Sequence, residues 1–277
     1  MSEDPSASRR SRMGVSLPQL RGLLEAASAA TLPDATPRPA PGFGLAVLDD
    51  TLLPGTLHEL QAVREADGAA LAGFALGAAQ RLAGGRAIVW VRQDFLDAEG
   101  GRVHPPGLAE IGLDPAAVTL VRTRDVMGVL QAGLEAARCR AVGVVLIEPW
   151  GETRALDLTA SRRLLLAAHG SGATVILGRI APPPGPSAAE TRWRVSAAPS
   201  RPEPANAPGA PAFRVELLRR RGGAPGGTWC VEWNRDRNRF EERGDLAGAT
   251  LSRAVVPLPA DRSALPGTGR AAVRRTG

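Results

Sequence analysis

The sequence predicts an α/β protein with a mostly parallel sheet, crossover helices and an antiparallel edge. From residue 45 onward, apolar strand-like segments alternate with helical ones, which is typical of a parallel sheet. Residues 141–147 hold five branched apolar side chains, a composition that suits a strand buried on both faces. Between residues 191 and 233 three strand-like runs follow one another with only loops between them, which indicates antiparallel pairing.

The pattern also predicts the individual elements. Leu20, Leu23 and Leu24 fit one face of a short amphipathic helix over residues 17–30. Gly84 and Gly85 then end the first helix of the sheet region. The expected strands are 56–63, 87–92, 118–121, 141–147 and 174–180, with 191–197, 213–219 and 228–233 as the antiparallel ones, and the expected helices are 69–83, 108–111, 125–138 and 158–169.

Composition along the chain predicts one domain between two tails. Residues 1–44 are expected to form a basic arm, the short helix and a proline-rich linker. Residues 45–240 are expected to form the α/β domain, and residues 241–277, which are small and polar with no clear period, a flexible C-terminal tail.

The basic residues are all arginine. The chain has 277 residues and a formal net charge of +6, with 34 basic against 28 acidic residues and neither lysine nor tyrosine. The absence of lysine excludes Schiff-base chemistry and a phosphate-binding lysine, so phosphate contacts would need arginine or backbone N–H groups. Two cysteines and a polar N-terminus without an apolar run favour a cytoplasmic protein without a disulfide framework, a secretory signal or a membrane span.

The turn between the first strand and its helix is where a nucleotide phosphate would bind. On the frame of a phosphate-binding loop the chain offers Ala62, Asp67, Gly68 and Ala69, so the lysine and the hydroxyl residue are both missing. Asp67 and Glu65 add negative charge where a polyphosphate needs positive charge. We therefore expect a degenerate nucleotide site without hydrolysis, or an ordinary strand-to-helix turn.

Two further side chains belong to this candidate site. Glu148 follows the most apolar strand, which is the position of a metal-holding acid in nucleotide hydrolases. The alternative is a structural acid that pairs with an arginine such as Arg179. Gln93, at the end of the second strand, could orient a water but cannot act as a base. The three histidines lie far apart without metal-ligand spacing, so no metal site and no catalytic residue are predicted.

Residues 213–240 carry seven arginines and a net charge of +4, interleaved with two tryptophans. Arginines next to aromatic rings can hold phosphates and stack on bases, so this region is a candidate contact for single-stranded DNA or a protein partner. The alternative is a solvated edge hairpin whose tryptophans cap the core. With the arginines of the preceding strand, the candidate contact residues are Arg192, Arg194, Arg214, Arg219, Arg220, Arg221, Trp229 and Trp233.

A family resemblance rests on six segments of the chain. They cover about residues 45–235 and comprise 57–60, 88–91, 104–108, 156–163, 187–200 and 214–223. The arginine-bearing segments 156–163 and 191–200 are the most specific. With these segments the chain resembles a RecA-like ATPase core and, more closely, the ImuA-type proteins of SOS mutagenesis, a branch also described as SulA-like. The loop at Ala62 to Ala69 departs from RecA itself.

The resemblance implies a non-catalytic, cofactor-free accessory of damage-induced mutagenesis, cytoplasmic and associated with the nucleoid after damage. The partners that it implies are the RecA recombinase, an ImuB-like Y-family polymerase subunit and, indirectly, an error-prone DNA polymerase. Two alternatives stay open. One is a residual nucleotide-dependent DNA-binding ATPase, and the other is a SulA-like inhibitor of cell division.

Overall fold

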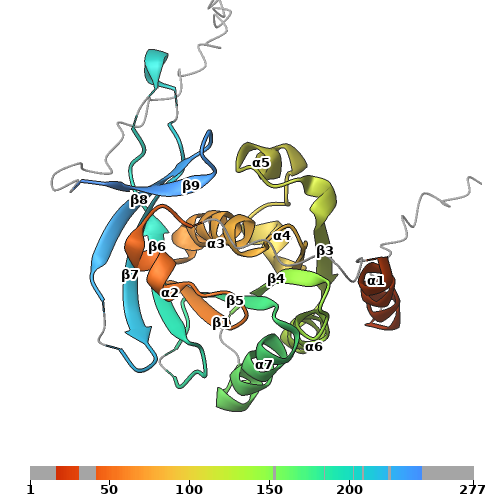
Figure 1. Ribbon diagram of the computed structural model, residues 1–277. Coiled ribbons are helices and arrows are strands. Elements are labelled where there is room, and N and C mark those ends of the chain that lie inside the picture. The colour runs from red at the N-terminus through yellow and green to blue at the C-terminus, as the bar shows by residue number, and fades with distance from the viewer. Residues whose placement is uncertain are drawn as a thin grey trace, which may run out of the picture. The chain divides into compact units, whose positions relative to one another are not determined.

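A nine-stranded sheet forms the centre of the computed structural model (Figure 1). The structure describes residues 17–30, 42–151, 154–183, 185–201, 203–207, 209–223 and 226–244. The strands are β1 (Leu57–Ala62), β2 (Ala87–Gln93), β3 (Val118–Thr123), β4 (Val142–Glu148), β5 (Thr174–Ile180), β6 (Thr191–Ala197), β7 (Ala212–Arg220), β8 (Thr228–Asn234) and β9 (Arg239–Arg243).

The sheet is mostly parallel, as the sequence predicts. Its strand order is β3-β2-β4-β5-β1-β6-β7-β8-β9. All pairings from β3 to β6 are parallel, and those from β6 to β9 are antiparallel. The carboxyl ends of the parallel strands therefore meet at one edge of the sheet, where α/β proteins bind their ligands.

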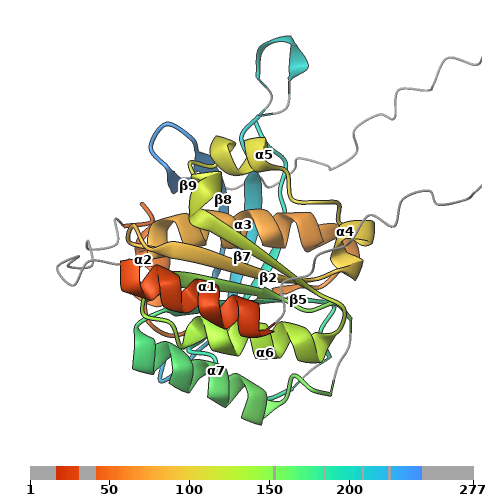
Figure 2. The ribbon, with the colours of Figure 1, turned by 90° about the vertical axis from the view of Figure 1, so that its right-hand side faces the viewer.

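Helices cover both faces of the sheet (Figure 2). Helix α3 (Gly68–Leu82) lies on one face, and α6 (Val126–Ala137) and α7 (Leu158–Ser171) lie on the other. The remaining helices are α1 (Leu17–Ala30), α2 (Ala46–Thr51), α4 (Phe95–Glu99) and α5 (Pro105–Glu110), with short 3₁₀ turns at Glu65–Asp67, Pro115–Ala117 and Pro204–Asn206. The predicted bounds of α1 are confirmed, and its Arg21 is paired with Glu135 of α6 at 3.0 Å.

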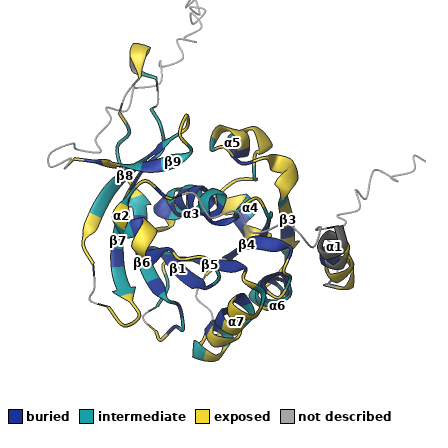
Figure 3. Ribbon diagram, in the orientation of Figure 1, coloured by how far each residue is buried: buried dark blue, intermediate teal, exposed yellow. Residues whose placement is uncertain are grey.

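Two hydrophobic clusters make the core, one on each face of the sheet (Figure 3). The cluster under α3 contains the aromatic side chains, and Trp233 and Phe240 meet there edge to face at 4.9 Å between ring centroids. Gly77 of α3 faces these rings, and a Cβ at this position would lie 2.7 Å from Phe240. The helix can approach the antiparallel strands this closely because residue 77 has no side chain.

Some elements differ from the sequence-based expectation. Strand β6 pairs antiparallel with β7 as predicted, but it also pairs parallel with β1, so it belongs equally to the parallel part of the sheet. Strand β9 was not predicted, and it includes residues 241–243, which composition had placed in the tail. Helices α2 and α4 were also missed, because segments of five or six residues are too short to show a helical period.

Both ends of the predicted domain are tied together within the described residues. The Phe240 N–H donates to the carbonyl of Phe43, a residue that had been assigned to the linker, and both rings are buried. The expectations for residues 1–16, 31–41 and 245–277 lie outside the residues that the structure describes.

Candidate functional site

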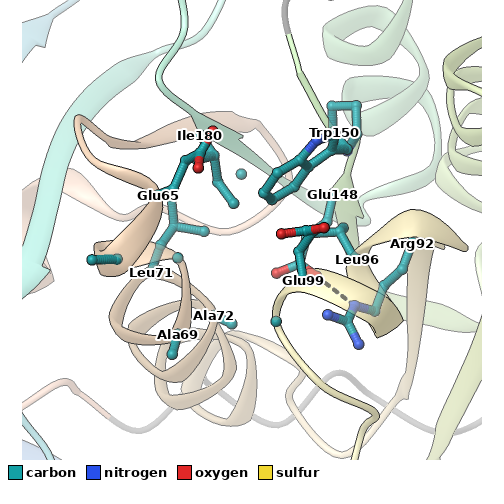
Figure 4. Close-up of a pocket in the computed structure, with 15 residues that line it drawn as sticks. Glu65, Ala69, Leu71, Ala72, Arg92, Leu96, Glu99, Glu148, Trp150 and Ile180 are labelled. Atoms are coloured by element: carbon teal, nitrogen blue, oxygen red, sulfur yellow. Dashed lines mark hydrogen bonds and ion pairs between the residues drawn. The ribbon is translucent and has the colours of Figure 1, made fainter.

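A cavity of about 380 Å³ lies where β2, β4 and β5 end and α3 begins (Figure 4). Its lining includes Gly68, Ala69 and Glu148 from the predicted nucleotide site, which the fold therefore brings together. Ala62 is fully buried at the end of β1 and does not line the cavity. The cavity occupies the edge of the sheet at which α/β proteins bind nucleotides.

Glu148 is held by two neighbours on β2. In the parallel pairing of β2 and β4, Arg92 lies opposite Glu148. The Arg92 Nε–H and the Trp90 Nε1–H both donate to Glu148 Oε2 at 2.9 Å. Glu148 therefore pairs with an arginine, as the structural alternative predicts, but the partner is Arg92. Arg179, the example named from the sequence, instead pairs with Glu59 at 3.1 Å.

This pair is buried, with 7% of the Arg92 and 10% of the Glu148 side chain exposed. Burial raises the pKa of Glu148, and the charge of Arg92 and the hydrogen bond from Trp90 oppose this rise without cancelling it. The Arg92 guanidinium also lies 5.0 Å from the Trp90 ring centroid. A metal ion at Glu148 would have to displace or share a carboxylate that already neutralises a buried cation.

Asp67 precedes the first residue of α3. Its carboxylate accepts hydrogen bonds from Arg64 Nε at 2.8 Å and from the backbone N–H of Ala197 at 3.1 Å. The hydrogen bond from Arg64 holds the pKa of Asp67 below its usual range. Asp67 therefore links the start of α3 to the end of β6, and Arg64 balances its charge in an ion pair at 2.8 Å.

The remaining walls are apolar and acidic. Gly178 lets two side chains approach β5, because a Cβ there would lie 2.8 Å from Leu71 and 3.6 Å from Glu148. Across the cavity, Trp150 packs on Phe95 at 5.4 Å between ring centroids. Among the described lining residues, Arg92 is the one cation, against the carboxylates of Glu65, Glu99 and Glu148. The cavity is thus poorly suited to a polyphosphate.

Gln93 has a structural contact. Its Oε1 accepts a hydrogen bond from the backbone N–H of Trp150 at 3.0 Å, and its Nε2 donates to the carbonyl of Arg124. These contacts join the end of β2 to the segment after β4. The amide is not a lining group of the cavity.

The arginines of the second candidate site divide into internal and exposed ones. Arg192 donates to the buried carboxylate of Glu59 at 3.3 Å and to the carbonyl of Gly185 at 3.0 Å. Burial raises the pKa of Glu59, but hydrogen bonds from Ser187 and Gln61 and the charges of Arg192 and Arg179 outweigh it, so the pKa is lowered. Arg192 is therefore part of a buried ion cluster and not a free surface cation.

Three further candidate arginines also make contacts within the protein. Arg194 pairs with Glu216 on the neighbouring strand β7. Arg219 donates to the carbonyls of Ser187 and Ala189 at 2.9 and 2.6 Å, and Arg220 donates to the carbonyl of Asp50 at 3.0 Å. Arg214 and Arg221 are exposed, and no side-chain partner is found for either among the described residues.

The two tryptophans pack into the core. Trp233 is 1% exposed, so its ring offers no surface to a base. Trp229 is half-buried and packs on Trp193 at 6.0 Å between ring centroids. These contacts agree with the alternative interpretation of residues 213–240, in which the tryptophans cap the core.

Sequence reasoning missed three residues that organise these sites, Trp90, Arg92 and Glu59, and it placed Arg179 beside the wrong carboxylate. The sequence contains part of the signal for the ion pair, because Arg92 and Glu148 carry opposite charges near the ends of two apolar strands. Their pairing follows from the order of β2 and β4 in the sheet, which the local pattern does not contain.

The described residues contain no helix that is long and apolar enough to cross a membrane. No protein-family model matches the chain. Among solved structures, the chain is similar to the RadB recombinase, with a TM-score of 0.48, 16% identity, and coverage of 71% of this chain and 96% of that one.

Among curated proteins, the chain is similar to Protein ImuA of Caulobacter vibrioides strains NA1000 / CB15N and ATCC 19089 / CIP 103742 / CB 15. In each case the identity is 34% over 217 residues, which cover 71% of this chain and 84% of the relative. Identity at this level over most of both chains shows common descent, and the chain belongs to the ImuA family.

Proposed function

We propose that the protein is a non-catalytic accessory of SOS-induced mutagenesis that acts by docking to other proteins. Membership of the ImuA family supports the assignment of the protein to SOS mutagenesis. The absence of nucleotide chemistry is supported chiefly by the ion pair between Arg92 and Glu148, since the acid in the metal-holding position already has a cation as its partner.

The rest of the cavity supports the same proposal. The chain has no lysine to neutralise a phosphate, and Glu65 and Glu99 repel one from the rim. A RecA-like core that keeps its strands and helices can act as a rigid docking surface even when it no longer binds or hydrolyses a nucleotide.

The proposed partners are the RecA recombinase and an ImuB-like polymerase subunit, through which the protein reaches an error-prone DNA polymerase. The proposed location is the cytoplasm, with recruitment to the nucleoid after DNA damage. The arginines of β6 and β7 offer little to DNA in this proposal, because most of them contact the protein's own carboxylates and carbonyls.

Calorimetric titration with Mg-ATP tests the non-catalytic part. We expect no binding at millimolar ATP for the wild type and for Glu148→Gln. Micromolar binding of Mg-ATP to a folded wild type, lost in Glu148→Gln that circular dichroism shows to be folded, would instead support the residual nucleotide-dependent alternative.

Complementation of a strain that lacks the gene tests the proposed role in SOS mutagenesis. Damage-induced mutagenesis should fall in the deletion strain and return with the wild-type gene. Normal mutagenesis in the deletion strain would refute the role in SOS mutagenesis.

A further inference from the structure

Helix α7 presents a leucine to solvent on the face that points away from the sheet. Leu166 is 69% exposed, the highest value among the large apolar side chains of the described residues. The sheet-facing side of the same helix is buried through Ser161, Leu164, Leu165 and Ala168. The exposed leucine therefore plays no part in the packing of α7 on the sheet.

Two cavities meet at Leu166. One of about 490 Å³ lies between α7, the segment before β6 and the end of β7, and includes Leu158, Leu165 and Leu166 in its lining. The other, of about 360 Å³, includes Arg138, Arg163 and Leu166. A large apolar side chain of a partner could bury itself beside Leu166 in the first cavity.

The lining of both cavities is basic. Arg162, Arg219 and Arg221 line the first and Arg138 and Arg163 the second, and no aspartate or glutamate of the described part of the chain lines either cavity. We call the surface of Leu158, Arg162, Arg163, Leu165, Leu166, Arg219 and Arg221 the α7 surface.

Only some of the arginines of the α7 surface make contacts within the protein. Arg219 donates to two carbonyls, and Arg138 outside this surface pairs with Glu135. Among the described residues, Arg162, Arg163 and Arg221 have no acidic side chain within ion-pair distance. Three cations beside an apolar cavity are thus available to an acidic partner.

We propose that the α7 surface binds an acidic segment of a partner protein that carries a large apolar side chain as its anchor. The anchor enters the cavity beside Leu166, and flanking carboxylates pair with Arg162, Arg163 and Arg221. This inference rests on the proposed docking function and specifies the chemistry of one docked partner.

A nucleic acid would match this surface less well. Its phosphates could pair with the arginines, but among the described lining residues His169 is the one aromatic ring beside three leucines, so bases would find little stacking surface. An acidic segment with an apolar anchor uses both the cations and the leucines.

Selection from a phage-displayed library of random peptides, with the full chain as bait, tests the proposal. We expect enriched peptides to be acidic around a large apolar residue. In fluorescence anisotropy, such a peptide should bind at least about ten-fold more weakly to Leu166→Glu and to the double variant Arg162→Glu/Arg163→Glu. Its binding to wild type should also weaken with salt.

Leu53→Glu and Arg214→Glu are the matched controls, because both side chains are exposed and lie outside the α7 surface. Neither control should change peptide binding. Enriched peptides without acidic residues, or equal binding to wild type and Leu166→Glu, would overturn the proposal. So would loss of oligo-dT binding in the double variant while peptide binding is retained.

The deletion strain separates this inference from the proposed function. Normal induced mutagenesis without the gene refutes the proposed function, whatever the peptides do. Reduced mutagenesis in the deletion strain, together with unchanged peptide binding in Leu166→Glu, refutes the α7 surface alone.

Discussion

Arg92 and Glu148 are directly opposite each other on neighbouring parallel strands, and the guanidinium Nε–H donates to the carboxylate at 2.9 Å. The pair stands at the carboxyl edge of the sheet, where related architectures bind their ligands. Here the two charges neutralise each other in the protein interior. The fold thereby depends on two side chains at the position that the sequence marks as a candidate nucleotide site.

The first prediction is that Arg92→Ala destabilises the protein by about 3 to 5 kcal/mol at neutral pH. Removal of the guanidinium leaves Glu148 buried without a cation. Since burial already raises the pKa of Glu148, the loss should shrink as the pH falls and the carboxyl becomes protonated. Urea unfolding at several pH values measures this.

Arg122→Ala is the control for this prediction. Arg122 pairs with Asp97, which also contacts Arg92, but its own side chain is 51% exposed. Its removal should cost less than about 1 kcal/mol. Equal losses in the two variants would contradict the assignment of Arg92 as the essential buried cation.

The second prediction concerns His58, which is fully buried in β1. In the neutral ring, Nε2–H donates to the Leu53 carbonyl and Nδ1 accepts from the Thr191 hydroxyl, both at 2.8 Å. Burial lowers the pKa of His58 from 6.5 to about 4, while the hydrogen bond to Leu53 opposes this shift.

Because the folded-state pKa of His58 is lowered, its contribution to stability is complete above about pH 6.5 and is lost as the pH falls toward 4. The loss should be about 3 kcal/mol. Between pH 6.5 and pH 4, the free energy of unfolding should fall by about 3 kcal/mol more for wild type than for His58→Gln, which urea unfolding at each pH measures. Parallel pH profiles would show that His58 titrates normally.

The third prediction compares two arginines on the same strand. Arg192 is 17% exposed and contacts Glu59, which is fully buried, whereas Arg194 is 44% exposed and pairs with Glu216 at the surface. Arg192→Ala should cost about 3 kcal/mol and Arg194→Ala less than about 1 kcal/mol. Thermal unfolding of both variants measures the difference, and a larger loss for Arg194 would contradict the inward placement of Arg192.

The fourth prediction concerns Gly77, where a Cβ would lie 2.7 Å from Phe240 and 3.1 Å from Trp233. Gly77→Ala should destabilise the protein by about 1 to 3 kcal/mol through overpacking. Gly170→Ala in α7, where a Cβ meets nothing within 4 Å, should stabilise it by about 0.5 to 1 kcal/mol. Denaturant midpoints of the two variants should therefore move in opposite directions.

The sequence by itself determined the α/β class, the parallel core strands and the lack of a phosphate-binding lysine. These properties are local, since a run such as residues 142–148 shows its burial in its own composition, and a missing residue type needs no structure. For the same reason the bounds of α1 and of β5 were predicted correctly.

The tertiary structure alone decided which charges meet. Arg92 reaches Glu148 because the two residues are opposite each other in the pairing of β2 with β4. Strand β5 also borders β4, but Gly178 rather than Arg179 faces Glu148, and Arg179 on the opposite face pairs with Glu59 of β1. The parallel pairing of β6 with β1 turns Arg192 inward in the same way. Partners in a sheet are separated by whole crossovers in the chain, so no local pattern contains them.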